Sequence, residues 1–203
     1  MRLKDFVPPI VGKAVRRFQK PRLFDGDDAM FRARLQGASV YGEYGMGASS
    51  RWVLANTSAK VVAVDTSEAW VNSVKDAFKD EPRLKARWID VGPVGEWGVP
   101  LGFSRSDNFE QYFNAIWDDQ DQPEVVLVDG RFRVACFLTS LLRAAPGVRI
   151  IFDDYMNRPH YHLVEDFVKP AETCGRQALF IVPEALDRSL IAQRREAFRH
   201  VRD

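Results

Sequence analysis

The chain has few cysteines and histidines, almost no net charge and no long apolar run. Its two cysteines, Cys136 and Cys174, form no CxxC pair and suit reduced thiols, so a disulfide framework is not expected. The three histidines among 203 residues make a His-rich metal site improbable. No stretch approaches the ~20 apolar residues of a membrane-spanning helix. We therefore expect a soluble cytoplasmic protein without a transmembrane segment.

The balance of charge excludes another class of function. Lys and Arg number 29 and Asp and Glu number 28, which gives a formal net charge of +1. Such a chain has no overall positive field for nucleic acid, so we expect a small-molecule partner and no nucleic acid. Only the first 22 residues are locally basic, and they could make weak peripheral contact with a membrane. Pro8, Pro9 and Gly12 interrupt them, which favours a solvated segment instead.

Two regions follow from these observations: an N-terminal basic lead-in over residues 1–36 and a single domain over residues 37–203. In the second region, short apolar runs alternate with longer helix-like segments, a pattern typical of a parallel sheet covered by helices. Strands are predicted near 38–43, 60–65, 86–90, 124–129 and 148–153. The expected fold class is α/β, a three-layer α-β-α Rossmann-like domain with a mostly parallel, doubly wound sheet.

Helices are predicted between these strands. Ser67 is placed to cap a helix whose Trp70, Val74, Ala77 and Phe78 share one face, and a nearly all-apolar helix runs from about Arg131 to Ala145. In the long connection 92–117, the helically spaced Phe109, Tyr112, Phe113 and Ile116 favour packing on the sheet. Residues 95–103 are predicted to form a mobile loop, able to act as a lid over a substrate.

The stretch VYGEYGMGASS at 40–50 lies where the first strand ends and a helix begins. Its glycines let a ligand approach the backbone, and the helix start offers unpaired N–H donors. A dinucleotide fingerprint needs GxGxxG, but reading from Gly45 places Ser50 where the third glycine belongs. Glu43 would repel a pyrophosphate and attract a cationic amino group. The stretch therefore favours a positively charged ligand.

Five segments together carry a resemblance to a known family: the glycine stretch, VVAVD ending at Asp65, ARWIDVG at 86–92, EVVLVDG at 124–130 and VRIIFDDY at 148–155. In order and spacing they resemble the motifs of class I S-adenosylmethionine-dependent methyltransferases. The resemblance implies that S-adenosylmethionine is the cofactor and that its methionine part lies at Glu43, Gly45, Gly47 and Ser49. It further implies that Asp65, with Thr66, binds the ribose and that Asp90 lies near the adenine. Alternatively, the glycines only make a tight turn and Asp65 only caps the next helix.

Acidic residues follow the fourth and fifth predicted strands, at the sheet edge where open parallel sheets bind ligands. Asp129, Asp153 and Asp154 should converge there and could hold Mg²⁺, an arrangement that resembles metal-dependent O-methyltransferases. The alternative is that Asp129 and Asp154 only surround the cofactor or cap loops. Candidate catalytic residues are Asp129, Asp154 and His160. A histidine such as His160 is more often a surface residue than a base.

The expected function is methyl transfer from S-adenosylmethionine, favouring an oxygen of a small-molecule or sugar-containing acceptor. An NAD(P)-dependent oxidoreductase and a non-catalytic methyltransferase-fold binding module stay open as alternatives. One departure from the family concerns the end of the chain. Only one strand, at 178–183, is predicted after the fifth, followed by a helical pattern over 186–201, so the antiparallel hairpin typical of the family is in doubt.

Overall fold

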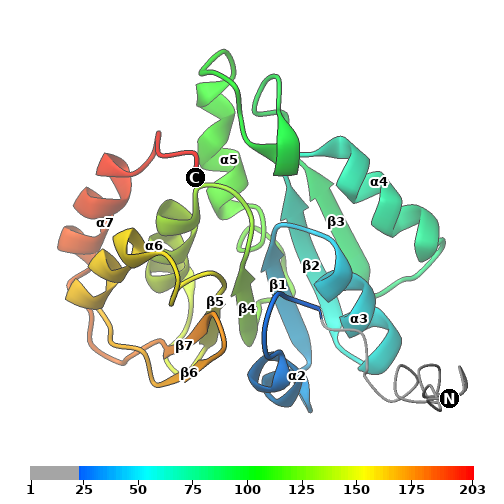
Figure 1. Ribbon diagram of the computed structural model, residues 1–203, viewed down its shortest axis with the longest axis horizontal. Coiled ribbons are helices and arrows are strands. Elements are labelled where there is room, and N and C mark those ends of the chain that lie inside the picture. Colours follow the sequence, from blue (N-terminus) through cyan, green and yellow to red (C-terminus); the bar gives the residue numbers. More distant parts are fainter. Residues whose placement is uncertain (1–22) are drawn as a thin grey trace, which may run out of the picture.

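A computed structural model describes residues 23–203, and its centre is a seven-stranded sheet (Figure 1). The predicted basic segment of residues 1–22, with its proposed membrane contact, lies outside the described residues. The strand order is β3-β2-β1-β4-β5-β7-β6. The strands are β1 (Val40–Tyr44), β2 (Lys60–Asp65), β3 (Leu84–Trp88), β4 (Val125–Val128), β5 (Arg149–Phe152), β6 (Glu172–Cys174) and β7 (Gln177–Ile181).

The first five strands are parallel, and the direction of winding reverses between β1 and β4. In the register, Tyr41 of β1 pairs with Val61 of β2 on one side and with Val125 of β4 on the other. The chain leaves β1 toward β2 and β3 and then returns to β4 and β5, so a crevice opens beyond the carboxyl ends of β1 and β4. This reversal fixes where the ligand site lies. The doubly wound α/β fold predicted from the alternating pattern is confirmed.

Helices cover both faces of the sheet, and side chains alternate between two buried clusters. The helices are α2 (Ala29–Leu35), α3 (Ala48–Asn56), α4 (Glu68–Ala77), α5 (Phe109–Asn114), α6 (Arg133–Arg143) and α7 (Arg188–Ala197), with 3₁₀ turns η1 (Glu96–Gly98), η2 (Ser106–Asn108) and η3 (Pro159–Asp166). On β4, Val126 and Val128 face the cluster beneath α5 and α6, whereas Val125 and Leu127 face the cluster beneath α2, α3 and α4. The strands are thus buried on both faces, as central parallel strands require.

The sheet edge differs from the prediction. A single strand was expected after β5, but β7 pairs antiparallel with both β5 and β6, which completes the hairpin. Strand β6 has only three residues, Glu-Thr-Cys, and two of them are exposed. A strand this short and polar carries no apolar alternation, so hydrophobic periodicity could not find it. The turn between β6 and β7 contains Gly175 and Arg176, and Arg176 reaches the ligand site.

Part of the stretch expected to be a lead-in belongs to the packed domain. Phe24, Met30, Phe31 and Leu35 are buried in the cluster beneath α3 and α4, and Phe31 contacts the Tyr41 ring edge-on. Residues 23–36 therefore close the bottom of one sheet face. Within residues 23–203, no helix combines the length and the apolar character needed to cross a membrane.

The long connection from β3 to β4 separates into a packed helix and an exposed loop. Phe109, Tyr112, Phe113 and Ile116 are fully buried, which confirms that this helix packs on the sheet. By contrast, Trp97 is 74% exposed and Phe103 52% exposed. The loop rises above the carboxyl ends of the strands at the top of Figure 1. Trp97 of this loop lines the cavity at the end of the sheet.

Candidate functional site

A cavity of about 830 Å³ opens beyond the carboxyl ends of the parallel strands. Its wall comes from residues 23–26, the connections that follow β1, β2, β4 and β5, the loop after β3 and the β6–β7 turn. The lining residues are Leu23, Phe24, Asp25, Gly26, Gly45, Met46, Gly47, Ala48, Ser49, Asp65, Thr66, Trp70, Trp97, Tyr112, Asp129, Gly130, Arg131, Arg133, Asp154, Arg158 and Arg176. A volume of this size suits a cofactor together with a small substrate.

The glycine turn after β1 forms the floor of the cavity. Gly45 has a φ of +90°, and a Cβ there would lie 2.7 Å from the Cα of Gly130. Only glycine lets the β1 turn and the β4 turn come this close. Gly47 caps α3, and a Cβ there would meet no atom within 4 Å. Because Gly47 lines the cavity, that open space is part of the cavity.

Asp65 joins the end of β2 to the glycine turn. One carboxylate oxygen accepts a hydrogen bond from Met46 N at 2.7 Å, and the other accepts one from Ser67 N at 2.7 Å. Burial raises the pKa of Asp65, while these backbone N–H groups lower it. Each oxygen keeps a further lone pair, so the carboxylate can accept hydroxyl donors from the cavity.

Glu43 lies beneath the turn and is not among the residues that line the cavity. It is fully buried and accepts hydrogen bonds from Tyr41, Ser49 and Ser50, two of which begin α3. Burial raises the pKa of Glu43 to about 7 against these three hydrogen bonds. The contacts of Glu43 therefore organise the start of α3, and its charge does not face the ligand space as the sequence argument assumed.

The cavity end beside β2 has an aromatic wall. Thr66 Oγ1 donates to the carbonyl of Gly98 at 2.7 Å, which ties the exposed loop to β2. Trp70, from the first turn of α4, and Trp97, from this loop, both line the cavity. Trp70 was predicted to share a helix face with Val74, but Val74 is buried together with Val71 and Trp70 is exposed. Asp90 lies outside the lining, with 41% of its side chain exposed and Arg105 at 3.4 Å.

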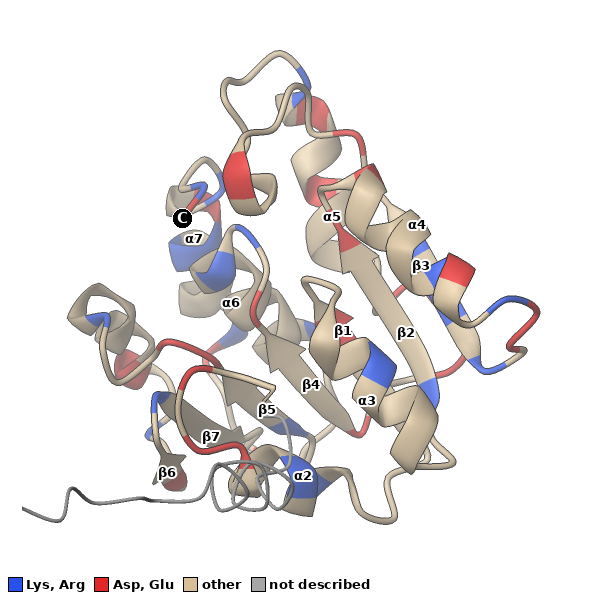
Figure 2. Cartoon of the chain, turned by 45° about the vertical axis from the view of Figure 1, so that its right-hand side comes forward, with Lys and Arg blue, Asp and Glu red and all other residues tan. Residues whose placement is uncertain are grey.

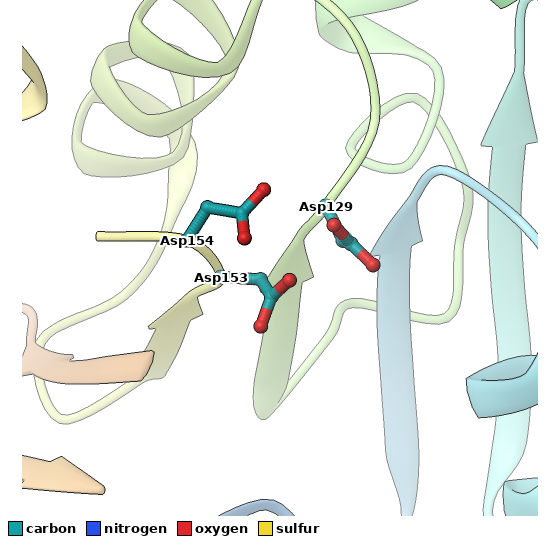
Figure 3. Close-up of side chains that lie close together, drawn as sticks. All are labelled: Asp129, Asp153 and Asp154. Carbon is teal, nitrogen blue, oxygen red and sulfur yellow. The ribbon is translucent and has the colours of Figure 1, made fainter. Parts of the chain in front are cut away.

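At the other end, the three aspartates converge. Asp129 follows β4, and Asp153 and Asp154 follow β5; one oxygen from each lies within 4.8 Å of the others (Figure 3). Asp154 adopts a left-handed φ of +58°, uncommon for a residue with a side chain. Burial, and then the Asp153 carboxylate, raise the pKa of Asp129 well above its ordinary value. His160 is not part of this group, because its side chain is 62% exposed and does not line the cavity.

Three arginines neutralise these carboxylates. Arg133, at the start of α6, bridges Asp129 at 2.9 Å and Asp154 at 3.1 Å. Asp154 also lies 2.8 Å from Arg158 and 3.3 Å from Arg176. Asp153 is fully buried and pairs with Arg176 at 2.5 Å. Along the connection from β4 to α6, an acidic position is followed by basic ones (Figure 2).

This arrangement does not fit the predicted Mg²⁺ site. A divalent ion needs carboxylate oxygens that face one another without a competing cation. Here guanidinium groups already lie at 2.5–3.3 Å from oxygens of Asp129, Asp153 and Asp154. A metal ion would be repelled by these fixed positive charges. The acidic cluster is therefore satisfied by protein cations.

Sequence reasoning missed the arginines and Trp70 of the cavity, whereas Trp97 belongs to the loop predicted as a lid. Arg131 and Arg133 follow Asp129 in the run DGRFR, and Arg158 lies four residues after Asp154. Basic residues so close to strand-end acids could have suggested ion pairs in place of a metal. Arg176 had no such signal, because it depends on the hairpin that periodicity did not predict.

Solved structures similar to this chain include methyltransferases. A methyltransferase-like protein from Silicibacter pomeroyi is 30% identical, with 97% of each chain covered and a TM-score of 0.72. A methyltransferase from Geobacter sulfurreducens is 14% identical, with 89% of this chain and 93% of that chain covered and a TM-score of 0.50. The N-methyltransferase NodS from Bradyrhizobium japonicum, solved with S-adenosyl-L-homocysteine, is 12% identical, with coverage of 80% and 91% and a TM-score of 0.50. No protein-family model matches the sequence, and no curated protein does.

Proposed function

The chain belongs to the class I S-adenosylmethionine-dependent methyltransferase superfamily, and on that premise we propose that it methylates an oxygen atom of a small-molecule or sugar-containing acceptor. One observation carries the proposal. A single cavity contains Asp65 and the glycine turn at one end and Asp129 and Asp154 at the other. A cofactor held at the first end would present its methyl group to an acceptor at the second.

The first end has the features needed for an adenosyl cofactor. Asp65 offers lone pairs to the ribose hydroxyls, and the space above Gly47 admits the methionine chain. Trp70 and Trp97 supply flat apolar surface for the adenine. NodS, which has the same fold, was solved with S-adenosyl-L-homocysteine. This supports the same cofactor for the present cavity.

The second end supports loss of a proton from a hydroxyl acceptor. During transfer, the acceptor oxygen forms a bond to the methyl carbon while the carbon–sulfur bond breaks and S-adenosylhomocysteine leaves. The hydroxyl proton needs a base, and burial together with the Asp153 carboxylate raises the pKa of Asp129, which makes it a stronger base than an ordinary aspartate. Arg133 holds Asp129 in place at 2.9 Å. Because the three aspartates are paired with arginines, the proposal contains no metal ion.

The proposal is tested by replacing Asp129 with Asn, which keeps the size of the side chain and removes the base. Release of S-adenosylhomocysteine from S-adenosylmethionine is measured with a panel of hydroxyl-bearing small molecules. Asp129→Asn should reduce turnover ~100-fold or more, in line with loss of a general base, and leave S-adenosylhomocysteine affinity within a few-fold of wild type. The exposed Asp107→Asn is the matched control. Equal turnover in wild type and Asp129→Asn would remove Asp129 from the reaction.

The two alternatives are separated by the same assay together with titrations of NAD and NADP. A binding module would bind S-adenosylhomocysteine and release none from S-adenosylmethionine with any acceptor. An NAD(P)-dependent oxidoreductase would bind NAD or NADP more tightly than S-adenosylmethionine.

A further inference from the structure

The end of the cavity beside β4 and β5 is rich in charges of both signs. Four arginines line the cavity: Arg131, Arg133, Arg158 and Arg176. Four carboxylates lie among them, those of Asp25, Asp129, Asp153 and Asp154, and Asp25 lies 3.5 Å from Arg176. The charges therefore balance, and the capacity to bind a ligand depends on which guanidinium groups keep N–H donors that no protein group uses.

Two of the four arginines direct their N–H donors to groups of the protein. Arg133 is almost completely buried and donates to Asp129, to Asp154 and to the carbonyls of Gly130 and Asp153. Arg176 donates to Asp153 and lies 3.3 Å from Asp154. Their N–H groups hold the aspartates in position, so these two arginines have little capacity left for a ligand.

Arg158 keeps several N–H donors that can bind a ligand. It lies at the cavity wall with 38% of its side chain exposed, 2.8 Å from Asp154 and 3.1 Å from the Tyr161 hydroxyl. Asp154 is shared with Arg133 and Arg176 as well, so one carboxylate faces three guanidinium groups. An arginine has five N–H donors, and these contacts leave several of them for the cavity.

Arg131 is the arginine without an acceptor. Its guanidinium makes no ion pair or hydrogen bond with any residue of 23–203, although its Nε is buried. Burial and the nearby Arg133 lower the pKa of Arg131, as expected for a cation whose partner is missing. A buried donor of this kind is costly unless water or a ligand in the cavity satisfies it.

We propose that Arg131 and Arg158 form a binding site for an anionic oxygen group, a carboxylate or a phosphate, on the methyl acceptor. This inference rests on the proposed function, because it assigns the acceptor end of the same cavity. The cofactor strengthens the argument: its sulfonium and ammonium groups outweigh its carboxylate, so the loaded cavity becomes more positive and attracts an anion more strongly. Paired N–H donors of arginine match the oxygen atoms of either group.

The cofactor has a carboxylate of its own, which is the other anionic group that Arg131 and Arg158 would bind. The experiment separates the two by first saturating the full chain with S-adenosylhomocysteine, which places that carboxylate. Inorganic phosphate is then titrated at constant ionic strength, with chloride as the reference salt, and thermal unfolding is followed. Arg131→Gln and Arg158→Gln are compared with Arg194→Gln, whose residue on α7 lies 3.8 Å from Asp166 and does not line the cavity.

We expect phosphate to raise the unfolding temperature of the saturated wild type in a saturable way that chloride does not reproduce. Arg131→Gln and Arg158→Gln should each weaken this binding ~10-fold or more, the loss expected for a charge-assisted hydrogen bond, and Arg194→Gln should leave it unchanged. No saturable effect of phosphate, or equal binding in all three variants, would overturn the inference and leave the proposed function standing. Failure of S-adenosylhomocysteine to bind would instead contradict the proposed function.

A second comparison uses 5′-methylthioadenosine, which lacks the amino acid end of the cofactor. If Arg131→Gln weakens S-adenosylhomocysteine but not 5′-methylthioadenosine, and phosphate competes with S-adenosylhomocysteine in the wild type, Arg131 binds the cofactor carboxylate and the inference is wrong. Equal affinities of wild type and Arg131→Gln for both compounds support the acceptor assignment.

Discussion

Two glycines of one turn should respond differently to the same substitution. Gly45→Ala places a Cβ 2.7 Å from the Cα of Gly130 and forces an alanine to φ +90°, so the β1 and β4 turns must separate. We expect a loss of ~1–3 kcal/mol in the free energy of unfolding, measured in urea, and a parallel loss of cofactor binding. Gly47→Ala is the control: its Cβ meets no protein atom within 4 Å, so it should weaken S-adenosylhomocysteine without changing stability. Equal stabilities of the two variants would show that the turns are not in such close contact.

Glu43 predicts a dependence of stability on pH. Its pKa is about 7 in the folded chain against an ordinary value of 4.5, so the folded state binds the proton more tightly than the unfolded state. The resulting stabilisation is complete below pH 4.5 and is lost as pH rises through 7, by about 3 kcal/mol in total. Glu43→Gln removes this titration, so its stability relative to wild type should rise between pH 5 and pH 8 in urea unfolding. The exposed Glu184→Gln should show no such change. A constant difference between Glu43→Gln and wild type would contradict a pKa of about 7 for Glu43 in the folded chain.

The pairing of the aspartates with arginines predicts independence from metal. Asp129, Asp153 and Asp154 already have guanidinium partners, so exhaustive chelation should leave methyl transfer unchanged, and added Mg²⁺ should not stabilise the chain. Loss of activity in EDTA, restored by Mg²⁺, would contradict this. At the residue scale, the sequence predicted the convergence of these acids from their strand-end positions. It could not reveal Arg176 as a partner, because Arg176 reaches these acids only through the β6–β7 hairpin.

At the scale of elements, the packing of α5 is the clearest test of the architecture. Phe113 is fully buried against the Phe132 ring at 5.4 Å, whereas Phe103, in the loop before α5, is 52% exposed. Phe113→Ala should lower the free energy of unfolding by ~3–5 kcal/mol, because it leaves a cavity beneath α6. Phe103→Ala should cost less than ~1 kcal/mol. Similar costs for the two variants in urea unfolding would mean that α5 does not pack as described.

The elements differ in how far their sequence determines them. Apolar runs such as VVLV of β4 and the apolar repeat of α6 follow directly from burial, and both were predicted close to their observed limits. Strand β6 has no such pattern and exists because β7 offers it an edge. Similarly, α2 adjoins a basic segment, yet its Phe31 belongs to the core. Tertiary partners decide these elements, and a local pattern cannot show them.

At the scale of the whole molecule, the site follows from the order of the strands. The reversal between β1 and β4 brings the Gly45 turn against Gly130, which places the cofactor end beside the strand-end acids. Residues 23–26 and the β6–β7 turn then close the crevice from outside, with Arg176 stacked over Phe24. Motifs far apart in the chain thus become the two ends of one cavity.

Binding of the methyltransferase cofactor through Asp65 can be measured by calorimetric titration with S-adenosylhomocysteine. Asp65→Asn preserves the shape of the side chain and removes its charge, and the exposed Asp76→Asn is the matched control. We expect wild type and Asp76→Asn to bind S-adenosylhomocysteine alike and Asp65→Asn to bind it ~10-fold or more weakly, because a charge-assisted hydrogen bond to the ribose is lost. No heat of binding in wild type at millimolar ligand, or equal affinity of wild type and Asp65→Asn, would contradict this expectation.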